Sequence, residues 1–235
     1  MLLNINNLVK IFSERTVLNI PQLSVSEGEL VGILGNNGAG KTTLFRLCLD
    51  LLKADAGTVS IDNGVVNNAD SWKASTSAFI DEHFLIDFLT PEEYFYFTGD
   101  LYGISKDRID SVLSDFIPFS GDEIFNKKKY IDKFSKGNKQ KIGIISAMLV
   151  RPKLLILDEP FNFLDPSSQI IMKRLLLEYN RKYGTTILLS SHNLQYVMDI
   201  CNRIIILESG CVIRDYDSIN DMNRLEIKQY FENIV

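Results

Sequence analysis

The chain contains several short runs of mostly apolar residues, and each run ends in polar or glycine residues. These runs occupy residues 29–34, 153–157, 185–191, 204–207 and 211–213. Continuous apolar runs of this length are typical of strands buried on both faces of a parallel sheet. Stretches with helical spacing separate most of them. The alternation predicts an α/β fold with a parallel core sheet.

The N-terminal part has a different pattern, in which short apolar segments are separated by turn residues. We expect short strands at residues 2–5 and 17–20, the second ended by Pro21. Residues 58–66 predict a hairpin with a glycine-containing turn at 62–64. These segments predict an N-terminal antiparallel β subdomain beside the parallel sheet.

Helical patterns dominate residues 81–149. Thr90, Pro91 and Glu93 predict a helix start, with threonine as the N-cap, proline at the first position and glutamate three residues after the cap. A second helical pattern ends at Pro118. The apolar residues of the first helix form a stripe, which we interpret as core or partner-facing: Tyr94, Phe95, Phe97 and Leu101.

The length of 235 residues suits one domain with an inserted subdomain. We expect a core of residues 1–80 and 150–235 and a helical subdomain at about 81–149. A final helix at 221–231 has ordinary amphipathic character.

The composition excludes several classes of protein. A net charge of -5 argues against a dedicated nucleic-acid binder, so we expect no nucleic-acid partner. No apolar run is long enough for a membrane span and no signal-peptide pattern opens the chain, so we expect a cytoplasmic protein. Cys48, Cys201 and Cys211 form no metal-ligand spacing, and we interpret them as reduced core thiols.

Residues 35–42 read Gly-Asn-Asn-Gly-Ala-Gly-Lys-Thr and match G-x-x-x-x-G-K-[ST] in full. A strand pattern precedes the motif and a helical pattern follows it, which disfavours a chance glycine-rich turn. Glycines let successive backbone N–H groups surround an anion at the helix N-terminus. We expect Lys41 to reach the β- and γ-phosphates and the Thr42 hydroxyl to hold Mg²⁺. The motif predicts a nucleoside triphosphate site with these binding residues: Asn37, Gly38, Gly40, Lys41, Thr42 and Thr43.

Polar side chains follow two of the apolar runs. Asp158 and Glu159 end one run, and His192 follows another. Ligands bind at the carboxyl ends of parallel strands. We expect Asp158 to hold Mg²⁺, Glu159 to polarise an attacking water and His192 to contact the γ-phosphate or orient that water. A turn-forming carboxylate and a structural histidine are the alternatives, and we interpret His83 as structural.

With these elements in this order, the chain resembles the nucleotide-binding subunit of ABC transporters over essentially its whole length. The resemblance is carried by residues 35–42, 134–138, 154–159 and 191–192. The second of these, the signature element, stands about twenty residues ahead of the Asp-Glu pair, an arrangement that other P-loop families do not share. The resemblance implies a P-loop NTPase core that binds ATP and Mg²⁺. It also implies head-to-tail pairing with a second such subunit, most simply as a homodimer.

The resemblance also assigns roles to single residues. It implies that Ser135 and Gly137 act on the partner's nucleotide, that Glu159 is the catalytic base and that His192 is the switch histidine. It implies that Phe12 stacks on adenine, whereas a buried aromatic of the sheet is the alternative. It implies that Asp165 lies in the loop that crosses the dimer seam, and the residues themselves predict Asp165 as a helix N-cap before Pro166.

Two departures from the family pattern concern the site. The signature has Lys136 and Asn138 where the family has Gly and Gln, and residues 134–141 resemble a variant found in an exporter-like branch. Lys136 either adds a cation near the phosphates or points to solvent. Asp81, with Glu82 beside it, stands where the family has a Gln, and the resemblance implies a ligand for Mg²⁺ or water there.

The sequence therefore predicts an ATPase that hydrolyses ATP to ADP and phosphate and drives a separate integral membrane permease, in the export direction. Such a subunit lies at the inner face of the cell membrane through its permease. A soluble ATP-driven switch of the same fold, acting on ribosomes or DNA, is the alternative. A GTPase would need Asn-Lys-x-Asp, and the Asn-Lys pairs at 126–127 and 138–139 both lack the Asp.

Overall fold

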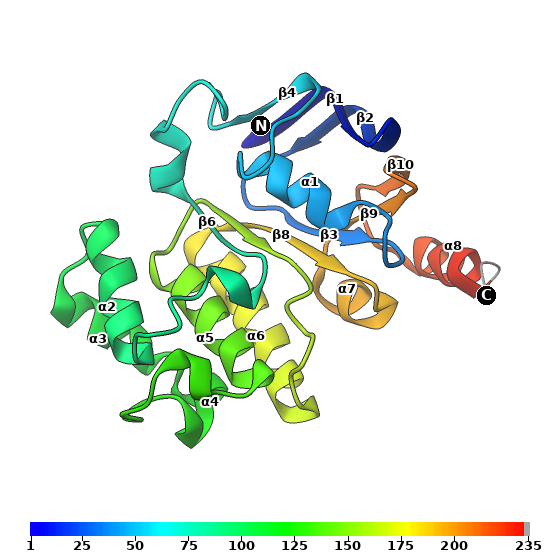
Figure 1. Ribbon diagram of the computed structural model, residues 1–235. Coiled ribbons are helices and arrows are strands. Elements are labelled where there is room, and N and C mark those ends of the chain that lie inside the picture. Colours follow the sequence, from blue (N-terminus) through cyan, green and yellow to red (C-terminus); the bar gives the residue numbers. More distant parts are fainter. Residues whose placement is uncertain (233–235) are drawn as a thin grey trace.

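The computed structural model describes residues 1–232, in which two sheets are stacked with helices around them (Figure 1). The strands are β1 (Leu3–Phe12), β2 (Arg15–Val25), β3 (Leu30–Leu34), β4 (Ala56–Ile61), β5 (Gly64–Val65), β6 (Thr76–Phe79), β7 (Leu154–Leu157), β8 (Thr186–Ser191), β9 (Arg203–Glu208) and β10 (Cys211–Tyr216). The helices are α1 (Lys41–Cys48), α2 (Pro91–Leu101), α3 (Lys106–Ser114), α4 (Ile117–Ser120), α5 (Lys136–Leu149), α6 (Pro166–Tyr183), α7 (Leu194–Ile200) and α8 (Asp221–Glu232). None of the helices within these residues has the length and apolar character needed to cross a bilayer.

The central sheet has the strand order β10-β9-β3-β8-β7-β6, and all neighbours are parallel except β9 and β10. Five of its strands correspond to the apolar runs of the sequence, whereas β6 was not predicted. The strands β3, β7, β8 and most of β9 are buried because both faces of the sheet are covered, and the edge strand β10 is exposed or half-buried. In β3, Leu30 and Leu34 pack on the side of α5, α6 and α7, whereas Val31 and Ile33 pack on the side of α1. The predicted α/β fold class is confirmed.

The second sheet is antiparallel, with the order β2-β1-β4-β5, and packs over α1 in the upper part of Figure 1. The prediction of short strands was wrong, because β1 and β2 have 10 and 11 residues. Pro21 lies inside β2 instead of ending it. β2 is an edge strand and its pairing skips Pro21 opposite the positive-φ residue Asn7, so the missing N–H breaks no ladder bond. The hairpin of β4 and β5 is present as predicted.

The helical region lies beside the lower face of the central sheet (Figure 1). α2 begins as predicted, with Thr90 and Glu93 forming a reciprocal capping box. The helix predicted before Pro118 is present as α3, but it ends earlier than predicted, at Ser114. Pro118 lies in the first turn of the short helix α4. The first turn of a helix tolerates proline because its N–H has no intrahelical acceptor.

The three cysteines do not share one environment. Cys48 and Cys201 are buried, and burial raises the pKa of the Cys48 thiol to about 12. Cys211 is exposed on β10, at the edge of the central sheet, so its interpretation as a core thiol was wrong.

Candidate functional site

The glycine-rich loop joins the end of β3 to the start of α1 in a backbone path that requires glycine. Gly40 is the N-cap of α1 with a φ of 107°, in the left-handed region. A Cβ on Gly35 would lie 2.3 Å from the carbonyl oxygen of Leu207. The loop therefore lies against β9, and α1 begins directly after it at Lys41.

Lys41 extends from this helix start toward the adjacent strand end. Its side chain is 6% exposed, and Nζ donates a hydrogen bond of 2.6 Å to the carbonyl of Gly35. Nζ also lies 3.3 Å from Oε1 of Glu159. The lysine and one carboxylate predicted from separate motifs are thus an ion pair.

Thr42 and Asp158 are in direct contact. The Thr42 hydroxyl donates to Oδ2 of Asp158 over 2.5 Å, and the hydroxyl of Ser190 donates to the other carboxylate oxygen. Burial raises the pKa of the Asp158 carboxyl, while the hydrogen bonds from Ser190 and Thr42 act in the opposite direction. The site therefore presents two adjacent oxygen ligands, one of them a carboxylate.

In the described part of the chain, no three His, Cys, Asp or Glu side chains gather as a complete metal site. A cation held between Thr42 and Asp158 would therefore take its remaining ligands from phosphate oxygens and water. Mg²⁺ bound by one or two carboxylates together with substrate phosphates has this pattern.

Glu159 and His192 form the second contact at the strand ends. Nδ1 of His192 lies 2.9 Å from Oε2 of Glu159, and the His192 backbone N–H donates to the same oxygen over 3.3 Å. The Glu159 backbone N–H donates to Ser190 over 2.8 Å. The two oxygens of Glu159 thus face different partners, with Oε1 on Lys41 and Oε2 on His192.

Asp81 lies near this group but has partners of its own. Its carboxylate contacts Arg46 at 3.4 Å and His83 at 2.8 Å. It lines one cavity of about 270 Å³ together with Asp158 and Glu159. The structure brings the three carboxylates to one cavity, and it gives His83 a contact that the sequence did not indicate.

The signature residues lie at the start of α5. The Ser135 hydroxyl caps the helix by accepting from the Asn138 N–H over 3.3 Å. Within residues 1–232, no hydrogen bond or ion pair joins Ser135 to the glycine-rich loop. Gly137 follows in the first turn.

Phe12 is at the end of β1, beside the turn to β2. Its side chain is 46% exposed, with Nζ of Lys10 5.2 Å from the ring centroid. The alternative of a buried sheet aromatic is excluded, and a ring face is accessible.

Two residues of the site were missed by sequence reasoning. Ser190 contacts both Asp158 and Glu159, and Nε2 of Gln140 donates to the Glu159 carbonyl over 3.2 Å. A hydroxyl near the end of an otherwise apolar strand was the available signal for Ser190. Gln140 had no such signal, because its contact depends on how α5 packs.

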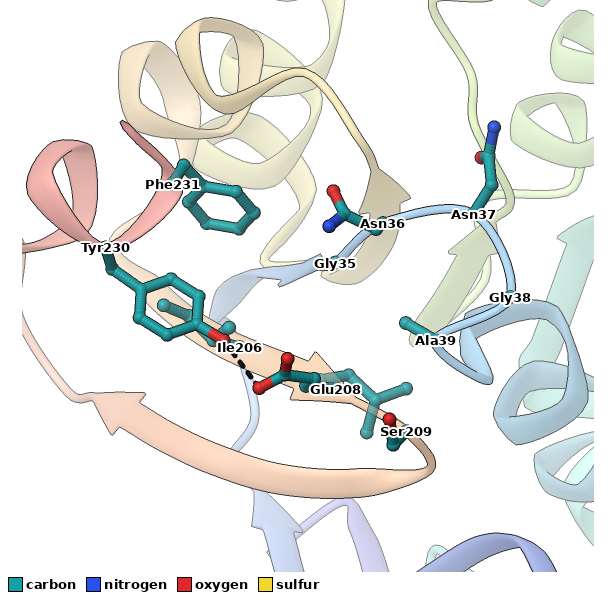
Figure 2. A pocket seen from close by; sticks show the side chains of 11 residues that line it. Gly35, Asn36, Asn37, Gly38, Ala39, Ile206, Glu208, Ser209, Tyr230 and Phe231 are labelled. Carbon is teal, nitrogen blue, oxygen red and sulfur yellow. Dashed lines mark hydrogen bonds between the residues drawn. The ribbon is translucent and has the colours of Figure 1, made fainter. Parts of the chain in front are cut away.

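The last turn of α8 also approaches the glycine-rich loop. Figure 2 shows Tyr230 and Phe231 across a cavity from the loop, which contributes residues 35–39. The cavity has a volume of about 180 Å³, and the Tyr230 hydroxyl donates to Glu208 over 2.7 Å. The sequence predicted only ordinary packing for this helix.

Known proteins resemble this chain in sequence and in fold. The family described as "ABC transporter" matches residues 18–162. The uncharacterized ABC transporter ATP-binding protein YdbJ of Bacillus subtilis is 36% identical over 89% of this chain and 67% of its own length. The methionine import ATP-binding protein MetN of Bacillus subtilis is 30% identical over 91% of this chain and 65% of its own. A solved structure of an ATP binding subunit of an ABC transporter superposes with a TM-score of 0.87 at 28% identity, covering 99% of both chains.

Proposed function

This chain belongs to the ABC transporter family, and from that membership we propose that it is the ATP-binding subunit of a transporter whose permease is a separate chain. It is an ABC ATPase, which hydrolyses ATP to ADP and phosphate for transport. The observation that carries the proposal is one connected cluster at the end of β3, in which hydrogen bonds and ion pairs join these residues: Lys41, Thr42, Asp158, Glu159, Ser190 and His192.

The residues of the cluster fit a triphosphate with Mg²⁺. The N-terminus of α1 offers backbone N–H groups and the positive end of its dipole to an anion, and Lys41 adds a full charge. Thr42 and Asp158 supply hard oxygen ligands for the cation. Bound Mg²⁺ neutralises charge on the phosphates during transfer.

We assign Glu159 as the general base. A carboxylate within reach of a water beside the γ-phosphate accepts its proton. His192 and Lys41 hold the two carboxylate oxygens in place, and Ser190 holds the backbone. We propose that His192 orients the same water or contacts the γ-phosphate, a role that its contact with Glu159 supports.

We propose that a second copy completes the nucleotide site. Ser135 and Gly137 lie at the N-terminus of a 14-residue helix, where N–H groups attract anions, and this supports action on the partner's nucleotide. The accessible ring of Phe12 supports stacking on the base. Because Asp81 shares a cavity with Asp158 and Glu159, we propose that its carboxylate would bind Mg²⁺ directly or through a water molecule.

The permease contact is assigned to a groove beside α2. Its volume is about 460 Å³, and its lining includes the exposed side chains of Leu51, Phe84, Phe97 and Leu101. Phe95, of the same predicted stripe, is fully buried, so the stripe serves both the core and this groove. A continuous exposed apolar groove indicates a protein contact. We propose that residues 81–149 form the subdomain that transmits motion to the permease.

The proposed export direction is supported only by the signature variant at residues 134–141. The relatives do not indicate a direction, because they include a methionine import protein. With the permease, the subunit is placed at the inner face of the cell membrane. The net charge of -5 disfavours the alternative of a switch acting on ribosomes or DNA.

The proposal is tested by expressing the chain with its polytopic membrane protein and measuring phosphate release from Mg·ATP. We expect co-purification with that protein and not with ribosomes, and loss of phosphate release in Lys41→Ala. The Phe97→Glu variant should no longer co-purify with the membrane protein, whereas the isolated variant should still bind ATP. Transport into or out of sealed vesicles assigns the direction. Wild-type protein without phosphate release, or co-sedimentation with ribosomes, would refute the proposal.

A further inference from the structure

One face of α5 contacts the loop of residues 159–165, which carries Glu159. The contacts come from positions that are neighbours on a helix surface: Lys136, Gly137, Gln140 and Lys141. Gln140 donates to the Glu159 carbonyl, and Nζ of Lys141 lies 3.9 Å from Oδ2 of Asp165. α5 therefore supports this loop at both of its ends.

The middle of the loop is held at Phe163. A Cβ on Gly137 would lie 2.5 Å from the Phe163 carbonyl oxygen, so helix and loop backbones touch there. Phe163 has a φ of 62°, which is uncommon for a bulky residue, and its side chain is 65% exposed. A left-handed conformation persists only where surrounding contacts fix it.

Lys136 supplies a side-chain contact at the same point. Its Nζ lies 5.3 Å from the centroid of the Phe163 ring, within the range of a cation–π interaction. The same Nζ is 3.9 Å from Oε1 of Glu82, the neighbour of Asp81. Lys136 thus contacts two loops that line the cavity of Asp158 and Glu159, while its side chain remains 65% exposed to solvent.

We propose that Lys136 is a positioning residue, whose cation–π contact with Phe163 holds the loop of residues 159–165 against α5 and so keeps Glu159 oriented for hydrolysis. The inference rests on the ATPase function proposed above. An exposed cation–π contact changes an equilibrium about two- to fivefold. Loss of the contact therefore lowers kcat by about that factor and leaves the KM for ATP unchanged.

The test is a double-mutant cycle on ATP hydrolysis by the full chain, with Lys136→Gln, Phe163→Leu and the double variant. We expect each single variant to lose about two- to fivefold in kcat and the double variant to lose no more than either. Lys136→Arg and Phe163→Tyr should retain activity, since a guanidinium group and a phenol ring can replace the ammonium group and the phenyl ring in the same contact. Lys106→Gln is the matched control, because Lys106 lies 4.8 Å from the Tyr96 ring away from the site, and its kcat should be unchanged.

Three results would overturn the inference. Losses that multiply in the double variant would mean that Lys136 and Phe163 act separately. A rise in KM for Lys136→Gln alone would mean that the lysine binds nucleotide directly. Unchanged kcat in both single variants would mean that the contact has no role. Failure of the wild type to hydrolyse Mg·ATP would refute the proposed function instead, so the two failures are distinguishable.

Discussion

Replacing Glu159 with glutamine separates the two contacts that this carboxylate makes. The substitution keeps the shape and the hydrogen bond to His192, and it removes the charge that Lys41 faces at 3.3 Å. A glutamine amide is not a general base, so the step that needs proton transfer is lost while the binding residues remain.

The magnitude follows from these contacts. Loss of a positioned general base lowers kcat about 10²- to 10⁴-fold. At an effective dielectric constant of about 20, the Coulomb attraction across 3.3 Å is about 5 kcal/mol. This attraction is an upper bound on the gain, and a net gain of about 1.4 kcal/mol in the binding of phosphate by Lys41 would raise the ATP affinity tenfold.

Two assays on the purified chain measure these effects: phosphate release at saturating Mg·ATP, and calorimetric titration with ATP. Glu178→Gln is the control, because Glu178 is exposed on the outer surface of α6 and should change neither quantity. Phosphate release at the wild-type rate in Glu159→Gln would refute the assignment of the base. A weaker ATP affinity in that variant would refute the role given to the Lys41 ion pair.

Other predictions concern backbone contact, exposure and capping. Gly137→Ala should lower the free energy of unfolding in urea by about 1–3 kcal/mol, because its methyl group meets the Phe163 carbonyl oxygen; unchanged stability would contradict this contact. Of the three cysteines, native protein should expose only Cys211 to a thiol reagent, and the denatured chain all three. Asp165→Ala should cost about 1 kcal/mol at pH 7, since Asp165 caps α6. Hydrogen bonds from Ser168 lower the pKa of the Asp165 carboxyl in the folded protein. The stability difference between wild type and Asp165→Ala should therefore be present above the ordinary carboxyl pKa and should vanish as the pH falls through the lowered pKa of the folded protein. A stability difference that does not change with pH would contradict this role of Asp165.

Local patterns were sufficient for much of the fold and site. A continuous apolar run in the sequence predicts a strand that is buried on both faces, and no information from elsewhere in the chain is needed. The strands β3, β7 and β8 were predicted in this way. The phosphate loop is equally local, because its glycines, Lys41 and Thr42 act through the backbone of one strand, turn and helix. The capping box of Thr90 and Glu93 needs only four consecutive residues.

Contacts between distant segments were decided only by the tertiary structure. Pro21 looked like a strand end, yet it lies within β2, because the sheet order makes that strand an edge. The exposure of Cys211 and Phe12 depends on what covers them, which no local pattern records. Sequence spacing likewise could not show that Lys41 pairs with Glu159, or that Lys136 lies over Phe163. The residue types at a site follow from short motifs, whereas their partners follow from the packing of strands and helices far apart in the chain.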